Sequence, residues 1–346
     1  IFGWQIFEGG IMGVALGVVL GSVMQLIVSA VGLVGLGFDY EFKLHWRNRG
    51  FRKVLSLLPA RSVDQGMDYA VSLVEVNLAS RLGDGVIRAY QQALTLHMMP
   101  INLIGVAVSN AAFPQLTEHL GNNRQDLFQK DLRQLLRVII WMAMPVSVIT
   151  FFTRGYVVHF IRNTGDPMMA GILGCLVVAI LFRTIYHMAA RAFYAQQDTK
   201  TPLNISFAAI GLNVVLAIVL SMVLKMGAYG LAWAQSTVAV IEVVILFVVL
   251  EKRIPHLFDA SFVVAILRMI MASTVAGIVC YLMLQVLPFR ESDSSFFSAF
   301  PKFMIIAGVS FLAYGLMSRM LKLPEVEPII RQVNKFLFVR LDGKRR

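Results

Sequence analysis

Residues 59–75 read PARSVDQGMDYAVSLVE and open an apolar segment that continues to about residue 82. On an α-helix, which turns about 100° per residue, the ionisable side chains of this stretch share one face with Ser72. These side chains are Arg61, Asp64, Asp68 and Glu75. Charged groups are costly in a lipid-embedded helix, so this face is expected to contact protein or a water-filled cavity.

Two interpretations of this face remain open. In the first, it lines a hydrophilic cavity and binds substrate. In the second, Arg61 and Asp64 lie at the membrane surface, and Asp68 and Glu75 are structurally paired. The cavity is favoured because the next apolar segment carries a matching polar face.

That next segment spans residues 87–114. Its polar residues follow helical spacing and are Arg88, Gln92, Thr95 and Asn102. Pro100 interrupts the segment midway and can kink the helix, because proline removes a backbone donor. Polar faces on neighbouring helices predict a central hydrophilic cavity.

A third polar face lies in residues 167–194, where Arg183 and His187 align on a helix. A guanidinium group suits phosphate because its planar fork allows bidentate contacts, so the arginines of these faces are candidates for holding phosphate. Two alternatives stay open: Arg88 lies at the external surface, and Arg183 pairs with a local acid. Glu242 is an isolated acid in an apolar segment, and the sequence does not name its partner.

The composition is that of an integral membrane protein, because 58% of the residues are hydrophobic and only 15% are charged. The net charge of +11 comes from basic residues between or beyond the apolar segments, which indicates membrane topology rather than nucleic-acid binding. The two cysteines form no disulfide or CxxC pattern. Because the chain starts at Ile1 without an initiator methionine, we expect it to be N-terminally incomplete.

A membrane-crossing helix needs about 20 mostly apolar residues, and about nine segments meet this requirement. The expected spans are 9–36, 57–80, 87–114, 133–153, 167–194, 203–225, 228–250, 262–288 and 299–320. The fold class is therefore all-α and membrane-integral. Of the 31 Lys and Arg residues, 22 lie in alternate connections and the C-terminal tail, and 7 lie in the connections on the other side of the membrane. This bias predicts that the C-terminus is cytoplasmic.

The segments outside the spans suggest contact with lipid. Residues 38–56 mix aromatic and basic side chains, as an interfacial helix on anionic lipid does, and the tail 323–346 ends in GKRR. Solvated loops remain the alternative for both. The sequence lacks HExxH, P-loop, GxSxG and DxD arrangements, so we expect neither catalysis, nor a cofactor, nor a metal site.

Residues 191–202, RAFYAQQDTKTP, resemble the FYxxQDxKTP signature of the MurJ/MviN lipid II flippases. The matching residues are Phe193, Tyr194, Gln197, Asp198, Lys200, Thr201 and Pro202. A second stretch, from Asn77 to Leu116, is similar to the family at Gly85, Tyr90 and Pro100, among other positions. The resemblance covers nearly the whole chain.

The resemblance implies a fold with two six-helix lobes around a cationic cavity and two extra C-terminal helices that form a groove for the lipid tail. The implied parts of this chain are the last N-lobe helix (1–37), a cytoplasmic amphipathic linker (38–56), the six-helix C-lobe (57–253), the two extra helices (254–322) and a cytoplasmic basic tail (323–346). It also implies a transporter that flips lipid II across the bacterial inner membrane by alternating access. Its partners would be the lipid-linked precursor and anionic lipids, and it would be a monomer.

Three positions depart from the family pattern. A cavity arginine of the family falls at Thr95, and a nearby glutamate falls at Met98. Asn213 is followed four residues later by Ala217, where sodium-coupled relatives carry an aspartate, so a sodium site is not expected. Two other functions stay open: export of another lipid-linked glycan or a drug cation, and a non-transporting membrane scaffold.

Overall fold

The computed structural model describes residues 11–33, 51–52, 55, 71–83, 85–160, 166–288 and 296–327. The chain divides into two units, Ile1–Arg61 and Ser62–Arg346. The first contains α2 (Ile11–Leu33), whose small and apolar residues form one continuous helix. The described residues contain helices and turns and no strand, which confirms the all-α prediction.

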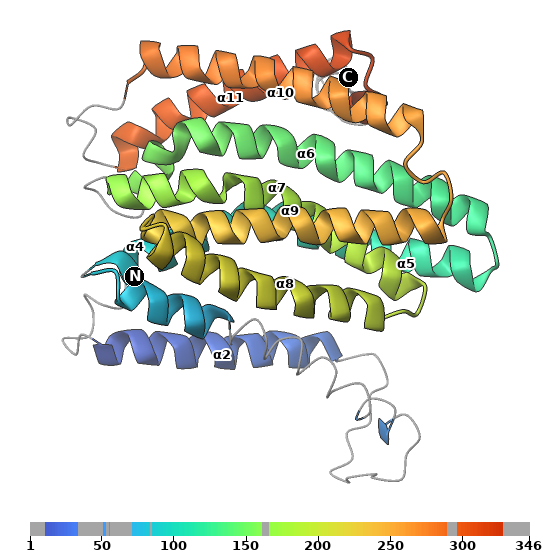
Figure 1. Ribbon diagram of the computed structural model, residues 1–346, viewed down its shortest axis with the longest axis horizontal. Helices are drawn as coiled ribbons and strands as arrows, with labels where there is room; N and C mark the ends of the chain where they lie inside the picture. Colours follow the sequence, from blue (N-terminus) through green and yellow to red (C-terminus); the bar gives the residue numbers. More distant parts are fainter. Residues whose placement is uncertain are drawn as a thin grey trace, which may run out of the picture. The chain divides into compact units, whose positions relative to one another are not determined.

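The second unit is a bundle of long helices. In chain order its elements are the helix Val71–Ser80, α4 (Val86–Pro100), η1 (Ile101–Val106), α5 (Ala107–Gly121), α6 (Gln125–His159), α7 (Pro167–Ala195), α8 (Lys200–Ile218), η2 (Val219–Val223), α9 (Ala228–Arg253), α10 (Ala260–Val286), α11 (Phe296–Met320) and η3 (Pro324–Val326). Figure 1 shows the long helices of this unit lying side by side. Seven helices in the described part of the chain are long and apolar enough to cross a membrane. The expected number of nine is not confirmed, because two further apolar helices are shorter over the described residues.

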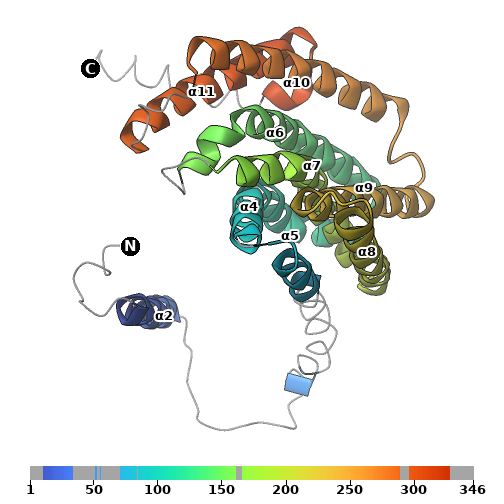
Figure 2. The same ribbon diagram turned by 60° about the vertical axis from the view of Figure 1, so that its left-hand side comes forward.

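α7 lies at the centre of the bundle and packs against α4, η1, α5, α6 and α9. Figure 2 shows α10 and α11 on the α6 side, with α8 and α9 together on the α7 side. Buried leucine, isoleucine and alanine side chains join α6, α7, α9 and α10 in the largest apolar core. A second core joins Val71–Ser80, α4, α7 and α9. α7 contributes buried residues to both cores, so the other helices are arranged around it.

The helix boundaries follow from local chemistry. α7 begins after Asp166, whose carboxylate accepts hydrogen bonds from the amides of Met168 and Met169, and Pro167 occupies its first position. α10 begins the same way after Asp259, which accepts from the Phe262 amide. α9 begins after Gly227 at φ 60°, a left-handed conformation that favours glycine.

Proline changes one helix without ending it. Pro100 is followed by η1, a six-residue π-helix, so the predicted distortion takes the form of a widened turn. The sequence placed the end of this span near Pro114, but α5 continues through Pro114 to Gly121. A proline costs one backbone hydrogen bond, and the buried Leu116 beyond it keeps the continuing helix packed.

Ion pairs hold several helix ends together at one end of the bundle. Arg133 of α6 donates to Asp259 at 2.8 Å, before α10. Arg253 at the end of α9 lies 2.6 Å from Asp198, between α7 and α8. Arg137 of α6 lies 2.5 Å from Glu325 of η3. These connections are among those predicted to carry most of the lysine and arginine residues, and they lie at one end of the second unit.

Candidate functional site

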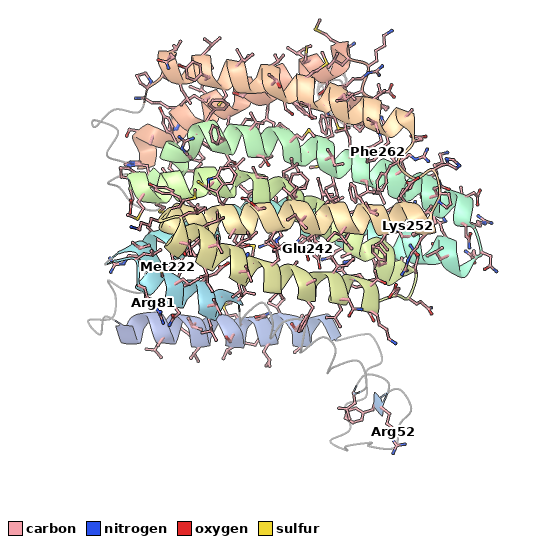
Figure 3. All side chains as sticks on the ribbon, in the orientation of Figure 1. Arg52, Arg81, Met222, Glu242, Lys252 and Phe262 are labelled. Carbon is pink, nitrogen blue, oxygen red and sulfur yellow. The ribbon has the colours of Figure 1, made fainter. Side chains whose placement is uncertain are left out.

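Two polar clusters lie along α7 and α9 within the apolar bundle. The Arg183 cluster comprises Arg183 and Tyr186 of α7, Ser206 of α8 and Glu242 of α9. The Glu75 cluster comprises Glu75 of the helix Val71–Ser80, Tyr90 of α4 and Gln235 of α9. Figure 3 shows Glu242 midway along α9, with Lys252 near the end of the same helix.

Arg183 and Glu242 form an ion pair in the middle of the bundle. Nη1 of Arg183 donates to Oε2 of Glu242 at 2.9 Å. The Glu242 side chain is 2% exposed, whereas that of Arg183 is 31% exposed. The acid is therefore enclosed by protein, whereas the Arg183 side chain is partly exposed.

The second oxygen of Glu242 is also bonded. Oε1 accepts a hydrogen bond from the Ser206 hydroxyl at 2.9 Å, and Ser206 shares a 2.8 Å hydrogen bond with the Tyr186 hydroxyl. The Tyr186 ring also lies under the guanidinium group, 5.9 Å from ring centroid to Cζ. Buried charges are tolerated when they are paired and hydrogen-bonded, and Glu242 meets both conditions.

The Glu75 cluster holds a buried carboxylate with neutral donors. The Tyr90 hydroxyl donates to Oε2 of Glu75 at 3.0 Å, and the Gln235 amide donates to Oε1 at 2.7 Å. Glu75 is 3% exposed, so it contacts protein in this conformation. Arg183 is within electrostatic range of Glu75, which links the two clusters.

Small residues let α7 approach its neighbours closely enough to form these clusters. The Ser236 hydroxyl of α9 donates to the Cys175 carbonyl of α7 at 2.6 Å, so a small polar side chain joins α9 directly to the backbone of α7. A Cβ atom added to Gly105 of η1 would lie 3.0 Å from both Cα and the carbonyl oxygen of Thr184. α7 is thus held between α9 on one side and the π-helix on the other.

The remaining predicted site residues fall in three places. Arg61, Asp64 and Asp68 lie outside the described residues. Arg88, Thr95 and Asn102 are exposed on α4 and η1. Gln92 and His187 are half-buried, and His187 lies beside the η1–α7 contact at Gly105.

Five cluster residues were not among the predicted site residues: Tyr90, Tyr186, Ser206, Gln235 and Glu242. Gln235 is a polar residue within the apolar span of α9, and a search for such positions would have found it. Ser206 and Tyr186 carried no such signal, because single hydroxyl residues are common in membrane helices. The partner of Glu242, which the sequence left unnamed, is Arg183.

The signature motif forms the turn between α7 and α8. Oδ1 of Asp198 accepts from the amides of Lys200 and Thr201, each at 3.0 Å, and Oδ2 accepts from the Thr201 hydroxyl at 2.6 Å. Gln197 adopts φ 60° in the turn that follows α7, while Pro202 lies in the first turn of α8. Arg253 of α9 contacts Asp198, Thr201 and the Phe193 ring, so the motif ties two connections together.

The described residues contain no group of three or more His, Cys, Asp or Glu side chains that could hold a metal ion. Asn213 is buried, and its Oδ1 has no hydrogen-bond partner in the structure. The side chain one turn later is Ala217, which offers no oxygen ligand.

Comparison with known proteins gives consistent results. Residues 1–299 match the family model described as lipid II flippase MurJ. The chain is 25% identical to a probable lipid II flippase MurJ of Thermotoga maritima, over 94% of this chain and 63% of the relative. It is 26% identical to the lipid II flippase MurJ of Burkholderia cenocepacia, over 70% of this chain and 49% of the relative.

A solved structure described as lipid II flippase MurJ in an inward closed conformation is similar in fold. Its TM-score is 0.68 at 22% identity, over 90% of this chain and 62% of the solved chain. This chain thus spans from about half to just under two thirds of the proteins that it matches.

Proposed function

Because the chain belongs to the lipid II flippase MurJ family, we propose that it takes part in moving an undecaprenyl-pyrophosphate-linked peptidoglycan precursor across the bacterial inner membrane. The family consists of transporters, and the chain is a multi-pass membrane protein. We further propose that transport proceeds by alternating access and that the connections tied by Arg133 and Arg253 face the cytoplasm, as the basic-residue bias predicts.

The observation that carries this proposal is the position of Arg183. Its side chain lies in the middle of a membrane-spanning helix, is partly exposed and uses one nitrogen for Glu242. An arginine has five N–H donors, so the remaining donors can form a bidentate contact with a phosphate oxygen pair. An intramembrane arginine with free donors suits a lipid whose headgroup carries a diphosphate.

An apolar cavity supports a lipid-linked substrate. It has a volume of about 550 Å³ and lies between α6, α7 and α10. Phe152, Leu181, Ile270 and Tyr281 contribute to its lining. In the proposed mechanism, this cavity accommodates part of the polyprenyl chain while Arg183 holds the phosphates.

The other predicted site residues keep their proposed roles. The exposed face formed by Arg88, Thr95 and Asn102 would border the path of the sugar headgroup. Gln92, His187 and Glu75 would lie beside it, while Arg61, Asp64 and Asp68 would extend the polar face beyond the described residues. Binding of anionic lipids and a monomeric state are parts of the same proposal.

The test is lipid II binding by Arg183 variants of the full natural polypeptide, measured by native mass spectrometry. Removing one charge-assisted, bidentate contact should cost about 1.5–3 kcal/mol, which is roughly a 10- to 100-fold loss of affinity. Arg183→Lys keeps the charge but loses the fork, so it should weaken binding less than Arg183→Ala.

The control removes the buried acid together with the arginine. Arg183→Ala alone leaves Glu242 buried without its cation, which can destabilise the fold by about 3–5 kcal/mol. The double variant Arg183→Ala/Glu242→Gln avoids this and should fold but bind weakly. If the folded double variant binds lipid II as wild type does, the diphosphate is held elsewhere.

A further inference from the structure

We propose that Glu242 takes up a proton when an anionic diphosphate group binds Arg183, so that substrate binding and proton binding are coupled at this ion pair. The inference rests on the proposed role of Arg183. The inference assigns a proton-coupling role to Glu242 of α9, the acid whose partner could not be named from the sequence.

The first step is the asymmetry of the pair. Glu242 is enclosed by protein, whereas the guanidinium group of Arg183 is partly exposed. An arriving anion can therefore reach Arg183 but not Glu242. When the guanidinium group turns toward the anion, the 2.9 Å contact with Glu242 is broken or weakened.

The second step concerns what remains around Glu242. The main elements packed against α9 are α7, α8 and η2, and the helix Val71–Ser80 contacts α9 through the hydrogen bond between Glu75 and Gln235. α7 contributes Arg183 and Tyr186, α8 contributes the Ser206 hydroxyl, and η2 has no ionisable side chain. Arg183 is thus the cation that faces Glu242 within the described part of the chain. Without it, the carboxylate would keep one hydroxyl donor and no positive partner.

The third step is the cost of that state. A buried carboxylate without a cation is strongly unfavourable, and a proton from water removes the charge. The proton adds to Oε2, which the arginine has left, and Oε1 continues to accept from Ser206. When the anion departs, the proton returns to water and Arg183 pairs with Glu242 again, so protons balance over the cycle.

Glu75 is the competing acceptor, because Arg183 is within electrostatic range of it too. His97 and His187 also lie within range of Arg183. The contacts distinguish the two acids: Glu75 is held by Tyr90 and Gln235, and neither contact is lost when Arg183 moves. Glu242 loses its direct partner, so the structure assigns the proton to Glu242.

The experiment measures protons and lipid together. Lipid II is added to the full natural polypeptide in weakly buffered nanodiscs at pH 7, with a pH-indicator dye reporting proton uptake and native mass spectrometry reporting binding. Wild type should take up on the order of one proton per lipid bound, and its affinity should fall by up to about tenfold per unit rise in pH. Inorganic pyrophosphate serves as a second probe and shows whether the diphosphate alone is sufficient.

The variants identify the acceptor. Glu242→Gln should still bind lipid II, take up no proton and lose the pH dependence of its affinity. Glu118→Gln, at an exposed position on α5, is the matched control and should behave as wild type.

Three results would overturn the proposal. Binding by wild type without proton uptake would leave the proposed function intact but remove the coupling. Loss of uptake in Glu75→Gln, with uptake retained in Glu242→Gln, would move the proton to Glu75. If wild type binds neither lipid II nor pyrophosphate, the role of Arg183 and the coupling are refuted together.

Discussion

At the α7–α8 turn, the Asp198 carboxylate accepts hydrogen bonds from the turn and also pairs with Arg253 of α9. The Thr201 hydroxyl, the Thr201 amide and Arg253 all stabilise its ionised form, and together they lower the pKa of Asp198 to about 2. The side chain is about one fifth exposed, so solvent screens its charge and the contribution to stability is modest. The signature motif is thus explained locally as a capped turn anchored to α9.

The turn predicts a pH-dependent stability. Because the folded pKa lies below the ordinary value near 4, the stabilisation is complete above about pH 4 and is lost as the pH falls toward 2. Asp198→Asn keeps a side-chain oxygen for the two amides but loses the charge that pairs with Arg253, so it should lower the free energy of unfolding by up to about 1 kcal/mol at neutral pH, as loss of a partly exposed ion pair does. The difference in Tm between wild type and variant, recorded from pH 6 to pH 2, should shrink only below about pH 4.

Glu118→Gln is the control for this series, since Glu118 is exposed and has no part in the turn. A difference between wild type and Asp198→Asn that stays constant down to pH 2 would show that the ionised carboxylate does not stabilise the turn.

At the scale of elements, close helix contacts are set by glycines. A Cβ atom at Gly230 of α9 would lie 2.6 Å from the Leu220 carbonyl carbon of η2. At Gly105 the nearest backbone atoms would be 3.0 Å away, and at Gly211 nothing lies within 4 Å. Backbone atoms cannot move aside as flexible side chains can, so these three positions should differ in their tolerance of alanine.

Alanine substitutions should therefore rank in one order. Gly211→Ala should change stability by no more than about 1 kcal/mol, since alanine favours helix. Gly105→Ala and then Gly230→Ala should destabilise increasingly, by about 1–3 kcal/mol or more, because overpacking forces the backbone to shift. Thermal unfolding in detergent measures the order, and equal Tm values for Gly230→Ala and Gly211→Ala would contradict the packing argument.

The helices themselves were largely predictable, because a run of about 20 apolar residues has few alternatives to a membrane-spanning helix. The expected span 167–194 is observed as Pro167–Ala195, and 228–250 as Ala228–Arg253. α6 begins at Gln125, eight residues before the expected start of its span, because its amphipathic first turns continue the helix beyond the apolar part. Hydropathy detects the portion in lipid and not the helix that extends past it.

The pairing of side chains across helices was not predictable in the same way. The polar faces identified Arg183 and Glu75, but their partners Glu242, Tyr90 and Gln235 are 59, 15 and 160 residues away. Periodicity relates residues on one helix, whereas these contacts depend on the rotation of each helix about its axis. That rotation is set by packing, such as the Ser236 contact with α7.

At the scale of the whole molecule, the proposed orientation can be tested at two described connections. Asn122 lies between α5 and α6, and Met226 lies between η2 and α9. In a version with Cys175 and Cys280 replaced, a single cysteine at position 122 should react with an impermeant thiol reagent only from the cytoplasm. One at position 226 should react only from the periplasm, and labelling of both from the same side in intact cells would refute the orientation.

The contact of η3 with α6 bears on how the protein can be engineered. Glu325 is 4% exposed and neutralises Arg137 within the bundle, although it lies beyond the last long helix. Trimming the chain at Met320, where the hydrophobic sequence ends, would discard this acid and leave the arginine uncompensated. A fluorescent reporter or affinity tag is therefore better joined after Glu327, which keeps the ion pair between Glu325 and Arg137 of α6.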